Sequence, residues 1–254
     1  MYKLSAADFA DTGQWRLLIK IGYTGLEAFL ENTLHPEIEP QFFCNASWEF
    51  NRDKLRNNIE DAVYNNPRLL DDFATRIILY DPRTLFIPTE IAEKSVGAEE
   101  ELYKKVYVAE NADIMTDADK DITAVWSMAP GIKSFLMRTF PGARITCNLM
   151  DKIRAIRKSN KGLSLFAYPH DAETDIIFLD EDNLISASTH EWSHMDDIAY
   201  LFLNLLDIYG FKLEDCSLHL EAVKPETQAW DYLKKKAADI SFTHSDPYNE
   251  NNKR

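Results

Sequence analysis

The fold is decided by the stretch Trp15-Arg-Leu-Leu-Ile-Lys-Ile21, an apolar run with the length and composition of a buried β-strand. Gly22-Tyr-Thr-Gly25 follows as a turn, and Leu26–Asn32 predicts a second strand. Pro40 precedes a third predicted strand, Gln41–Trp48. Short strands separated by turn residues are typical of an antiparallel meander. This part of the chain therefore predicts three successive strands of one sheet.

Helical spacing replaces the strand pattern after this meander. Asn51 has the side chain of an N-cap residue, and it precedes apolar residues at helical spacing, namely Leu55, Ile59, Ala62 and Val63. Pro67 marks the end of this predicted helix, and Arg76–Tyr80 then predicts a buried strand that ends at Asp81-Pro82. A helix in this position carries the chain back across the sheet, so we expect the fourth strand to lie parallel to the first.

A later part of the chain repeats this order of elements with different residues. The predicted elements, in order, are the strands Leu163–Tyr168, Asp175–Leu179 and Leu184–Ser188, a helix from near Met195 to Gly210, and the strand Ser217–Leu220. The first two strands are joined by a turn at Pro169–Asp171, and the next two by a turn at Glu181–Asn183. Both parts follow the order strand, strand, strand, helix, strand at similar spacing. We therefore expect a tandem duplication.

The stretch between these two parts has a mixed pattern. It contains two strand-like runs and two helix-like runs, which are Val106–Val108, Ile122–Trp126, Gly131–Phe140 and Leu149–Lys158. These elements complete the first predicted lobe and connect it to the second. We expect a first lobe over residues 1–160, a second, shorter lobe over residues 161–242, and a disordered polar tail over residues 243–254.

Composition limits the classes of partner. The 254 residues include 42 Asp and Glu but only 28 Lys and Arg, which gives a net charge of −14. Such an acidic surface repels phosphate backbones and anionic lipid headgroups, so neither nucleic acid nor a membrane is an expected partner. The cysteines Cys44, Cys147 and Cys216 are far apart and form no C-x-x-C pair, which disfavours a disulfide framework. We expect a cytoplasmic protein, because a reducing compartment fits this cysteine usage.

Two further stretches carry a resemblance to a known family. They are Thr84-Leu-Phe-Ile-Pro88, after the fourth strand, and Ala129-Pro-Gly-Ile-Lys-Ser-Phe-Leu136, which leads to Phe140-Pro141. From Trp15 to about Phe242 the chain resembles an uncharacterised bacterial family, a domain-of-unknown-function family of the Bacteroidetes with an actin-like ATPase fold. The resemblance implies an α/β structure of two ribonuclease H-like lobes, each with a five-stranded mixed sheet flanked by helices. It implies no established activity.

Actin-like ATPases hold ATP between their lobes, with an Asp-x-Gly motif at the turn between the first two strands of each lobe. Glycine lets backbone N–H groups approach phosphate, and the aspartate positions magnesium or water. In the first turn Gly22 and Gly25 are present, but Lys20 stands at the aspartate position. The second turn, Tyr168–Ala172, has no glycine, and its proline lacks an N–H donor. ATP with magnesium is therefore disfavoured as a cofactor, although Lys20 could neutralise phosphate without a metal.

Two other catalytic classes fit the residues poorly. Ribonuclease H-like nucleases need carboxylates on the first strand of a lobe to hold two metals, and neither Leu17–Ile21 nor Leu163–Tyr168 contains one. The sequence His190-Glu-Trp-Ser-His194 matches the zinc metalloprotease signature, whose two histidines must share one face of a helix while the glutamate acts as general base. Here a predicted strand runs into the motif, and Ser193 with Asp196 resembles a capping box at the start of the next helix.

The zinc motif is therefore expected before the helix, and no metal is expected in this protein. A zinc hydrolase remains an alternative, with His190, Glu191 and His194 as metal candidates and His219 or Glu221 as a further ligand.

The leading hypothesis is a non-catalytic scaffold that binds or regulates another protein, with no catalytic residue. A nucleotide-binding actin-like ATPase is the main alternative. In either case the expected ligand-binding region lies between the lobes. Its candidate residues are Lys20, Gly22, Tyr23, Thr24 and Gly25 on one side, and His170 and Asp171 on the other.

Overall fold

The computed structural model describes residues 12–35, 38–79, 83–93, 97–107, 111–170 and 173–243. The chain forms two compact units. The first comprises Met1–Asp81 and Leu85–Asp151, and the second comprises Pro82–Thr84 and Lys152–Arg254. Nearly all of the predicted disordered tail lies outside the described residues.

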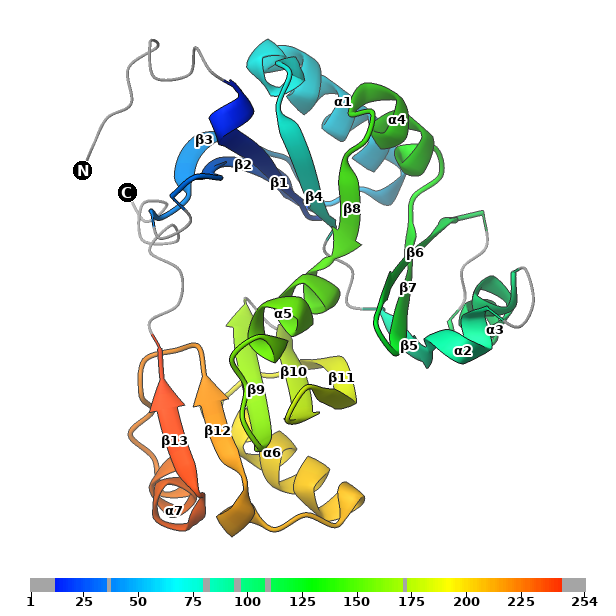
Figure 1. Ribbon diagram of the computed structural model, residues 1–254. Coiled ribbons are helices and arrows are strands. Elements are labelled where there is room, and N and C mark those ends of the chain that lie inside the picture. The colour runs from blue at the N-terminus through cyan, green and yellow to red at the C-terminus, as the bar shows by residue number, and fades with distance from the viewer. Residues whose placement is uncertain are drawn as a thin grey trace. The chain divides into compact units, whose positions relative to one another are not determined.

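The first unit is built on a five-stranded mixed sheet, whose strands lie in the order β3-β2-β1-β4-β8 (Figure 1). The strands are β1 (Trp15–Ile21), β2 (Gly25–Asn32), β3 (Gln41–Ser47), β4 (Ala74–Leu79) and β8 (Arg144–Cys147). β1 runs antiparallel to β2 and parallel to β4, as predicted. β1 is central because Leu17, Ile19 and Ile21 are fully buried, which agrees with its apolar sequence.

Helices α1 (Leu55–Asn65) and α4 (Ile132–Thr139) connect the strands of this sheet. The predicted apolar residues of α1 are the buried ones, namely Leu55, Ile59, Ala62 and Val63. Asn51 is a cap residue, but it caps the short 3-10 helix Arg52–Lys54 in front of α1, where its Oδ1 accepts from the N–H groups of Asp53 and Lys54. The helical turn therefore starts where the sequence predicted it, and it becomes an α-helix one turn later.

An insertion between β4 and α4 forms a separate small layer of the first unit. It contains the three-stranded sheet β5-β7-β6 and two helices. Their bounds are β5 (Leu85–Pro88), α2 (Thr89–Ala92), α3 (Ala98–Val106), β6 (Asp113–Asp119) and β7 (Ile122–Met128). The predicted strand at Val106–Val108 is wrong, because Val106 is the last residue of α3 and its neighbour Tyr103 is buried against Val125. Val106 ends a helix whose first turn is acidic, which is a favourable charge at a helix N-terminus, and Val108 lies outside the described residues.

The second unit repeats the plan of the first, with a sheet in the order β11-β10-β9-β12-β13 (Figure 1). Its strands are β9 (Leu163–His170), β10 (Glu173–Asp180), β11 (Asn183–Glu191), β12 (Ser217–Leu220) and β13 (Asp239–Phe242). Its helices are α5 (Asn148–Arg157), which begins in the first unit, α6 (Met195–Tyr209) and α7 (Gln228–Lys236). β9 is antiparallel to β10 and parallel to β12, so both units have the predicted order of strands and helices.

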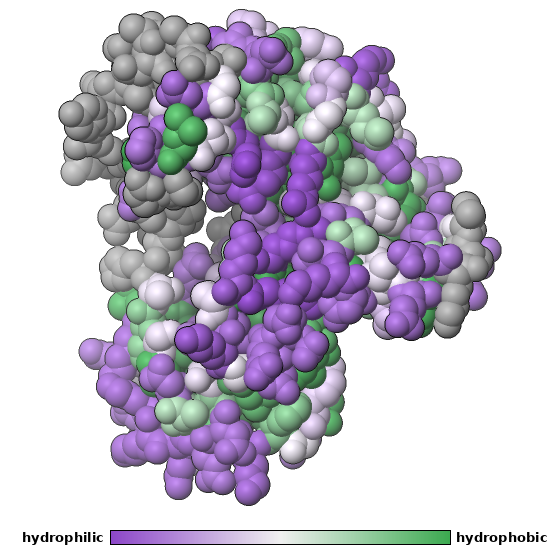
Figure 2. Space-filling view, viewed as in Figure 1, coloured by the Kyte–Doolittle hydropathy of each residue, from purple (hydrophilic) through white to green (hydrophobic). Residues whose placement is uncertain are grey.

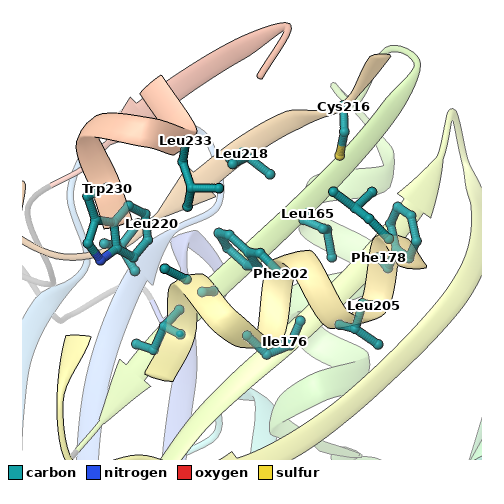
Figure 3. Packing of buried hydrophobic residues seen from close by; sticks show 14 of the residues in the cluster. Leu165, Ile176, Phe178, Phe202, Leu205, Cys216, Leu218, Leu220, Trp230 and Leu233 are labelled. Atoms are coloured by element: carbon teal, nitrogen blue, oxygen red, sulfur yellow. The ribbon is translucent and has the colours of Figure 1, made fainter. Parts of the chain in front are cut away.

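One face of the second sheet packs against α6 and α7 (Figure 3). Leu165, Ile176 and Leu218 point from three strands toward Phe202 of α6, and Trp230 of α7 closes one end of this core. Side chains alternate along a strand, so Tyr168 and Asp175 lie on the opposite face, where α5 packs. The second sheet is thus covered on one face by the apolar sides of α6 and α7, and it is contacted on the other face by the basic helix α5.

The helix α6 begins one residue later than the capping-box prediction. Its N-cap is His194 rather than Ser193, and the Nδ1 of His194 accepts from the N–H of Asp196. Asp197, not Asp196, is the acid that returns to the cap, where its Oδ2 accepts from the N–H of His194 at 2.9 Å. The motif is a capping box, as predicted, but it is shifted by one residue, because a histidine nitrogen replaces the usual hydroxyl as acceptor.

Among the described residues, no helix has both the length and the apolar character needed to cross a membrane.

Candidate functional site

The first predicted turn, between β1 and β2, uses its backbone groups within the first unit. The N–H of Gly22 donates to the carbonyl of Gly25 at 2.9 Å. Trp48 donates its backbone N–H to the carbonyl of Thr24 at 2.9 Å and its Nε1–H to the carbonyl of Tyr23 at 2.8 Å. The structure therefore brings four of the predicted residues, 22 to 25, together in one turn and fastens that turn to the chain after β3.

The two glycines of this turn differ in how much space a side chain would have at each position. A Cβ placed on Gly25 would lie 2.9 Å from the carbonyl oxygen of Ala46 in β3, closer than real side chains come. A Cβ on Gly22 would have 3.9 Å to its nearest neighbour. Gly25 is thus required by the close pairing of β2 and β3, so its presence is explained without a phosphate.

Lys20, the fifth predicted residue of the first unit, lies on β1 and is half-buried. Its Nζ lies 5.2 Å from the centre of the Phe29 ring, within the range of a cation–π contact. Lys20 pairs in register with Glu27 of β2. Its ammonium group is therefore engaged with the unit's own sheet.

The second predicted turn is shorter than the sequence suggested. Pro169 and His170 were expected in the turn, but both belong to β9, where they pair with Thr174 and Glu173 of β10. Proline can occupy this position because it retains its carbonyl acceptor and loses only a donor. Only residues 171 and 172 separate the paired ends, and Asp171 lies outside the described residues. Of the two predicted residues in this unit, the structure thus describes only His170.

His170 takes part in a buried polar cluster that no sequence motif predicted. Its centre is Asp175 of β10, whose side chain is 3% exposed. Lys152 of α5 places its Nζ 3.0 Å from Asp175 Oδ2, and Thr189 of β11 donates its hydroxyl to Oδ1 at 2.7 Å. The Nε2 of His170 lies 3.4 Å from Oδ2. Three elements and the end of β9 therefore meet at one carboxylate.

The electrostatics of the cluster keep Asp175 ionised. Burial alone would raise the pKa of Asp175, but contact with His170, the charge of Lys152 and the hydrogen bond from Thr189 outweigh it and lower the pKa to about 2. Lys152 Nζ also lies 4.2 Å from the centre of the Tyr168 ring. Burial, then the charges of Glu221 and Asp175, raise the pKa of Tyr168 well above its ordinary value, so its phenol stays neutral. The cluster therefore fastens α5 to the sheet through the ion pair of Lys152 and Asp175.

The cluster has little capacity for metal chemistry. Within the described part of the chain, no group of three or more His, Cys, Asp or Glu side chains could hold a metal ion. The exposed side of α5 is covered by hydrophilic side chains (Figure 2). A sequence signal for the cluster did exist, since Asp175 is the one charged residue of the predicted strand Asp175–Leu179, whose other residues are apolar. A buried charge in such a strand needs a partner, although its sequence does not say which residue supplies it.

The zinc-signature residues lie on two different elements. His190 and Glu191 belong to β11, and His194 is the N-cap of α6, so the two histidines do not share a helical face. His190 Nε2 lies 2.7 Å from the hydroxyl of Ser188 on the same strand. His219, one of the suggested further ligands, lies on β12, which is separated from β11 by two strands, and its Nδ1 lies 2.6 Å from Ser241 Oγ. The signature in the sequence thus reflects a strand followed by a helix cap.

The strand β11 has an outer side, here called the open edge, that faces away from its sheet partner β10. β11 has nine residues and lies at the end of the sheet, and no strand of the described chain pairs with its outer side. From Leu184 to Thr189 it carries no ionisable side chain, and burial lowers the pKa of the following His190, which is therefore neutral at pH 7. Natural edge strands are usually protected against pairing with other chains by charges, prolines or a short length. β11 is nine residues long, and its interior contains neither a charged residue nor a proline.

Two sheets of the same strand order, each a meander followed by a helix and parallel strands, define the actin-like ATPase fold, and this chain has that fold. A protein from Bacteroides thetaiotaomicron with this fold and unknown function matches it with a TM-score of 0.76 and 19% sequence identity, over 93% of each chain. The sequence matches the family "Protein of unknown function (DUF3822)" over residues 5–232, so the chain belongs to the DUF3822 family.

More distant structures have lower similarity. The cytoplasmic domain of EpsL, an inner membrane component of the type II secretion system of Vibrio cholerae, matches with a TM-score of 0.49 and 7% identity, over 91% of this chain and 89% of that one. A PilM–PilN type IV pilus biogenesis complex matches with a TM-score of 0.45 and 11% identity, over 92% and 91%. No curated protein sequence matches.

Proposed function

We propose that this DUF3822 protein is a non-catalytic scaffold of the cytoplasm that binds another protein through its second unit. The observation that carries the proposal is the open edge of β11, a row of backbone donors and acceptors that no strand among the described residues pairs, on a strand with an uncharged interior. Such an edge binds an extended segment of a partner by adding it to the sheet as a further strand. The free thiols of Cys44, Cys147 and Cys216 suit a reducing compartment, and two of them are buried.

The non-catalytic part of the proposal is supported by the two turns where actin-like ATPases bind phosphate. In the first, the N–H of Gly22 is already bonded to Gly25, and Lys20 occupies the place of the expected aspartate. In the second, β9 and β10 stay paired up to His170, and Pro169 has no N–H to offer. A phosphate would have to displace existing bonds at one turn and would find one donor fewer at the other.

A nucleotide-binding ATPase remains the alternative because Lys20 offers a cation beside a turn with two glycines. Thermal unfolding with and without millimolar ATP and magnesium separates the two proposals. A specific ligand raises the melting temperature, because its binding adds RT ln(1 + [L]/Kd) to the free energy of unfolding. We expect no shift for the wild-type chain. A clear shift that disappears in Lys20→Ala would support the ATPase alternative instead.

The proposed binding is tested by capture with chemical cross-linking, using the full chain and two variants of one residue. Ala187→Pro removes a backbone N–H from β11, and Ala187→Ser keeps it as the matched control. A protein that cross-links next to residues 183–191 in the wild type and in Ala187→Ser, but not in Ala187→Pro, supports the proposal. Equal capture by all three forms would place the interaction elsewhere and contradict it.

A further inference from the structure

We infer that the open edge of β11 selects a partner segment with an uncharged centre of about five residues and with Lys or Arg on both sides of it. The inference rests on the proposed function and names the chemistry of its partner. Three observations carry it: the direction of the backbone groups, the fixation of the strand, and the charges at its two ends.

The register shows which backbone groups face outward. His170 and Glu173 pair across a connection of only two residues, and a pair that closes such a connection must exchange its hydrogen bonds within itself. Hydrogen-bonded pairs alternate along an antiparallel ladder, so residues 173, 175 and 177 of β10 bond to β9, whereas 174, 176 and 178 bond to β11. The β11 partners of the latter three are His190, Ser188 and Ser186.

The residues between them therefore direct their N–H and C=O groups to the open edge. These residues are Ala187, Thr189 and Glu191. Toward the start of β11, the regular pairing with β10 is interrupted near Ile185, where the register shifts between Phe178 and Leu179. A partner strand can thus form a regular ladder along about five residues of β11, 186 to 190, which sets the length of the uncharged centre.

The strand that presents these groups is held in place by its own side chains. Thr189 donates to the buried Asp175, and Ser188 lies 2.7 Å from the Nε2 of His190 in the same strand. Trp192, just beyond the strand, donates its Nε1–H to the carbonyl of Glu173 at 2.8 Å. Little conformational entropy is therefore lost by β11 when a partner adds to it, which favours binding to the preformed edge.

The two ends of the open edge are acidic. At one end lie Asp180, the last residue of β10, and then Glu181 and Asp182, which connect β10 to β11. At the other end lie Glu173 and Glu191, the latter exposed. A strand added along β11 places its flanking residues beside these acids, so basic flanks are attracted and acidic flanks are repelled. The net charge of −14 acts in the same direction at long range.

The same charges disfavour a second copy of this chain as the occupant. Two β11 strands paired about a two-fold axis through Ala187 would place Glu191 of each copy opposite Asn183 of the other. Glu191 would then lie beside Glu181 and Asp182 of that copy, at both ends of the interface. Like charges in such pairs are destabilising, so the occupant is a basic segment of a different protein.

The chemistry is tested with synthetic peptides and the full chain. The probe is fluorescent Lys-Lys-Val-Thr-Val-Thr-Val-Lys-Lys, and the comparison peptide has the same centre with glutamates in place of the lysines. Binding is measured by fluorescence anisotropy, and hydrogen exchange reports on individual backbone amides. We expect the lysine-flanked peptide to bind at least about tenfold more tightly, to lose affinity with added salt, and to slow exchange at Ala187 and Thr189.

Two kinds of variant separate the backbone contribution from the charges. Ala187→Pro is expected to abolish binding of the probe, and circular dichroism checks that it folds. The double variant Glu181→Lys with Glu191→Lys leaves the backbone intact, and we expect it to bind the glutamate-flanked peptide better than the lysine-flanked one. Glu214→Lys, an exposed charge reversal in the same unit, is the matched control and should change the Kd by less than about twofold.

Each contrary result has a defined meaning. If both peptides protect Ala187 and Thr189 equally, the edge binds strands but the inferred partner chemistry is wrong. If neither peptide binds, the inference is overturned, while the capture experiment still decides the proposed function. If the probe binds Ala187→Pro as well as the wild type, the edge itself is the wrong surface. A dimer in sedimentation that Ala187→Pro dissociates would make a second copy the occupant and overturn the inference.

Discussion

Thr189 on β11 donates its hydroxyl to the buried carboxylate of Asp175 on β10 at 2.7 Å. This hydrogen bond joins the edge strand of the second sheet to the neighbouring strand. Asp175 pairs in register with Thr189, so the two side chains emerge on the same face of neighbouring strands. The bond links the surface proposed for binding to the charged cluster that holds α5.

Replacing Thr189 by Val removes this hydrogen bond while keeping the shape of the side chain. We expect the free energy of unfolding to fall by about 1–2 kcal/mol, because a buried carboxylate loses one of its donors. Urea denaturation measures the change. Ser186→Ala on the same strand is the control, with an expected effect below about 0.5 kcal/mol. Equal losses for the two variants would show that Thr189 contributes no more than an ordinary edge hydroxyl.

Removing Lys152 leaves the charge of Asp175 buried without the cation that lies 3.0 Å from it. Lys152→Met should therefore lower the free energy of unfolding by about 2–3 kcal/mol, and adding Asp175→Asn should restore part of the loss. A double-mutant cycle measured by urea denaturation gives the coupling between the two residues. Additive effects would mean that the 3.0 Å contact does not contribute to stability.

The lowered pKa of Asp175 predicts a defined pH dependence. Its carboxyl has a pKa of about 2 in the folded chain against an ordinary 3.8, so the unfolded chain binds the proton more tightly. The resulting stabilisation, about 2 kcal/mol, is present above about pH 5 and is lost as the pH falls toward 2. We expect Asp175→Asn to lose less stability than the wild type between pH 5 and pH 3. Parallel curves for the two proteins would contradict this assignment.

The two glycines of the first turn provide a matched pair of substitutions. Gly25→Ala should lower the free energy of unfolding by about 1–3 kcal/mol, because its Cβ would press on the backbone carbonyl of Ala46. Gly22→Ala has space for the added methyl and should change stability by less than about 1 kcal/mol. Thermal denaturation measures both. A larger loss for Gly22→Ala would point to a role of this turn beyond pairing β2 with β3.

Metal analysis tests the zinc alternative directly. We expect the purified protein to contain no stoichiometric zinc and to keep its melting temperature in the presence of EDTA, because His190 and His194 lie on different elements. His190→Ala serves as the control. Stoichiometric zinc that this substitution removes would show that the histidines come together in solution and would revive the hydrolase alternative.

Much of the fold was predictable because its elements have strong local signals. The apolar run at Trp15–Ile21 and the helix around Ile59 are each specified by nearby residues alone, and the structure has both. The prediction of a short strand at Val106–Val108 was wrong because its local signal is weak. Three β-branched or aromatic residues fit a strand locally, but Val106 completes a helix whose Tyr103 is buried against another strand. Tertiary packing outweighs such weak propensities.

The candidate site was less predictable than the fold. The resemblance directed attention to the two turns, and the structure explains Gly25 by its distance from Ala46. The cluster at Asp175 was not predictable from a motif, because its other members, Lys152, His170 and Thr189, lie on different elements of the chain. Only the pairing of β9, β10 and β11 brings them together with α5.

By itself, the sequence determined the class of this protein: an acidic α/β chain with the same strand and helix order used twice, a pattern that depends on local periodicity and turn residues. Tertiary structure decided which backbone groups remain open, which charges are buried, and why a zinc signature forms no helical site. These properties depend on which strands become neighbours, and periodicity within one segment does not specify the register between two.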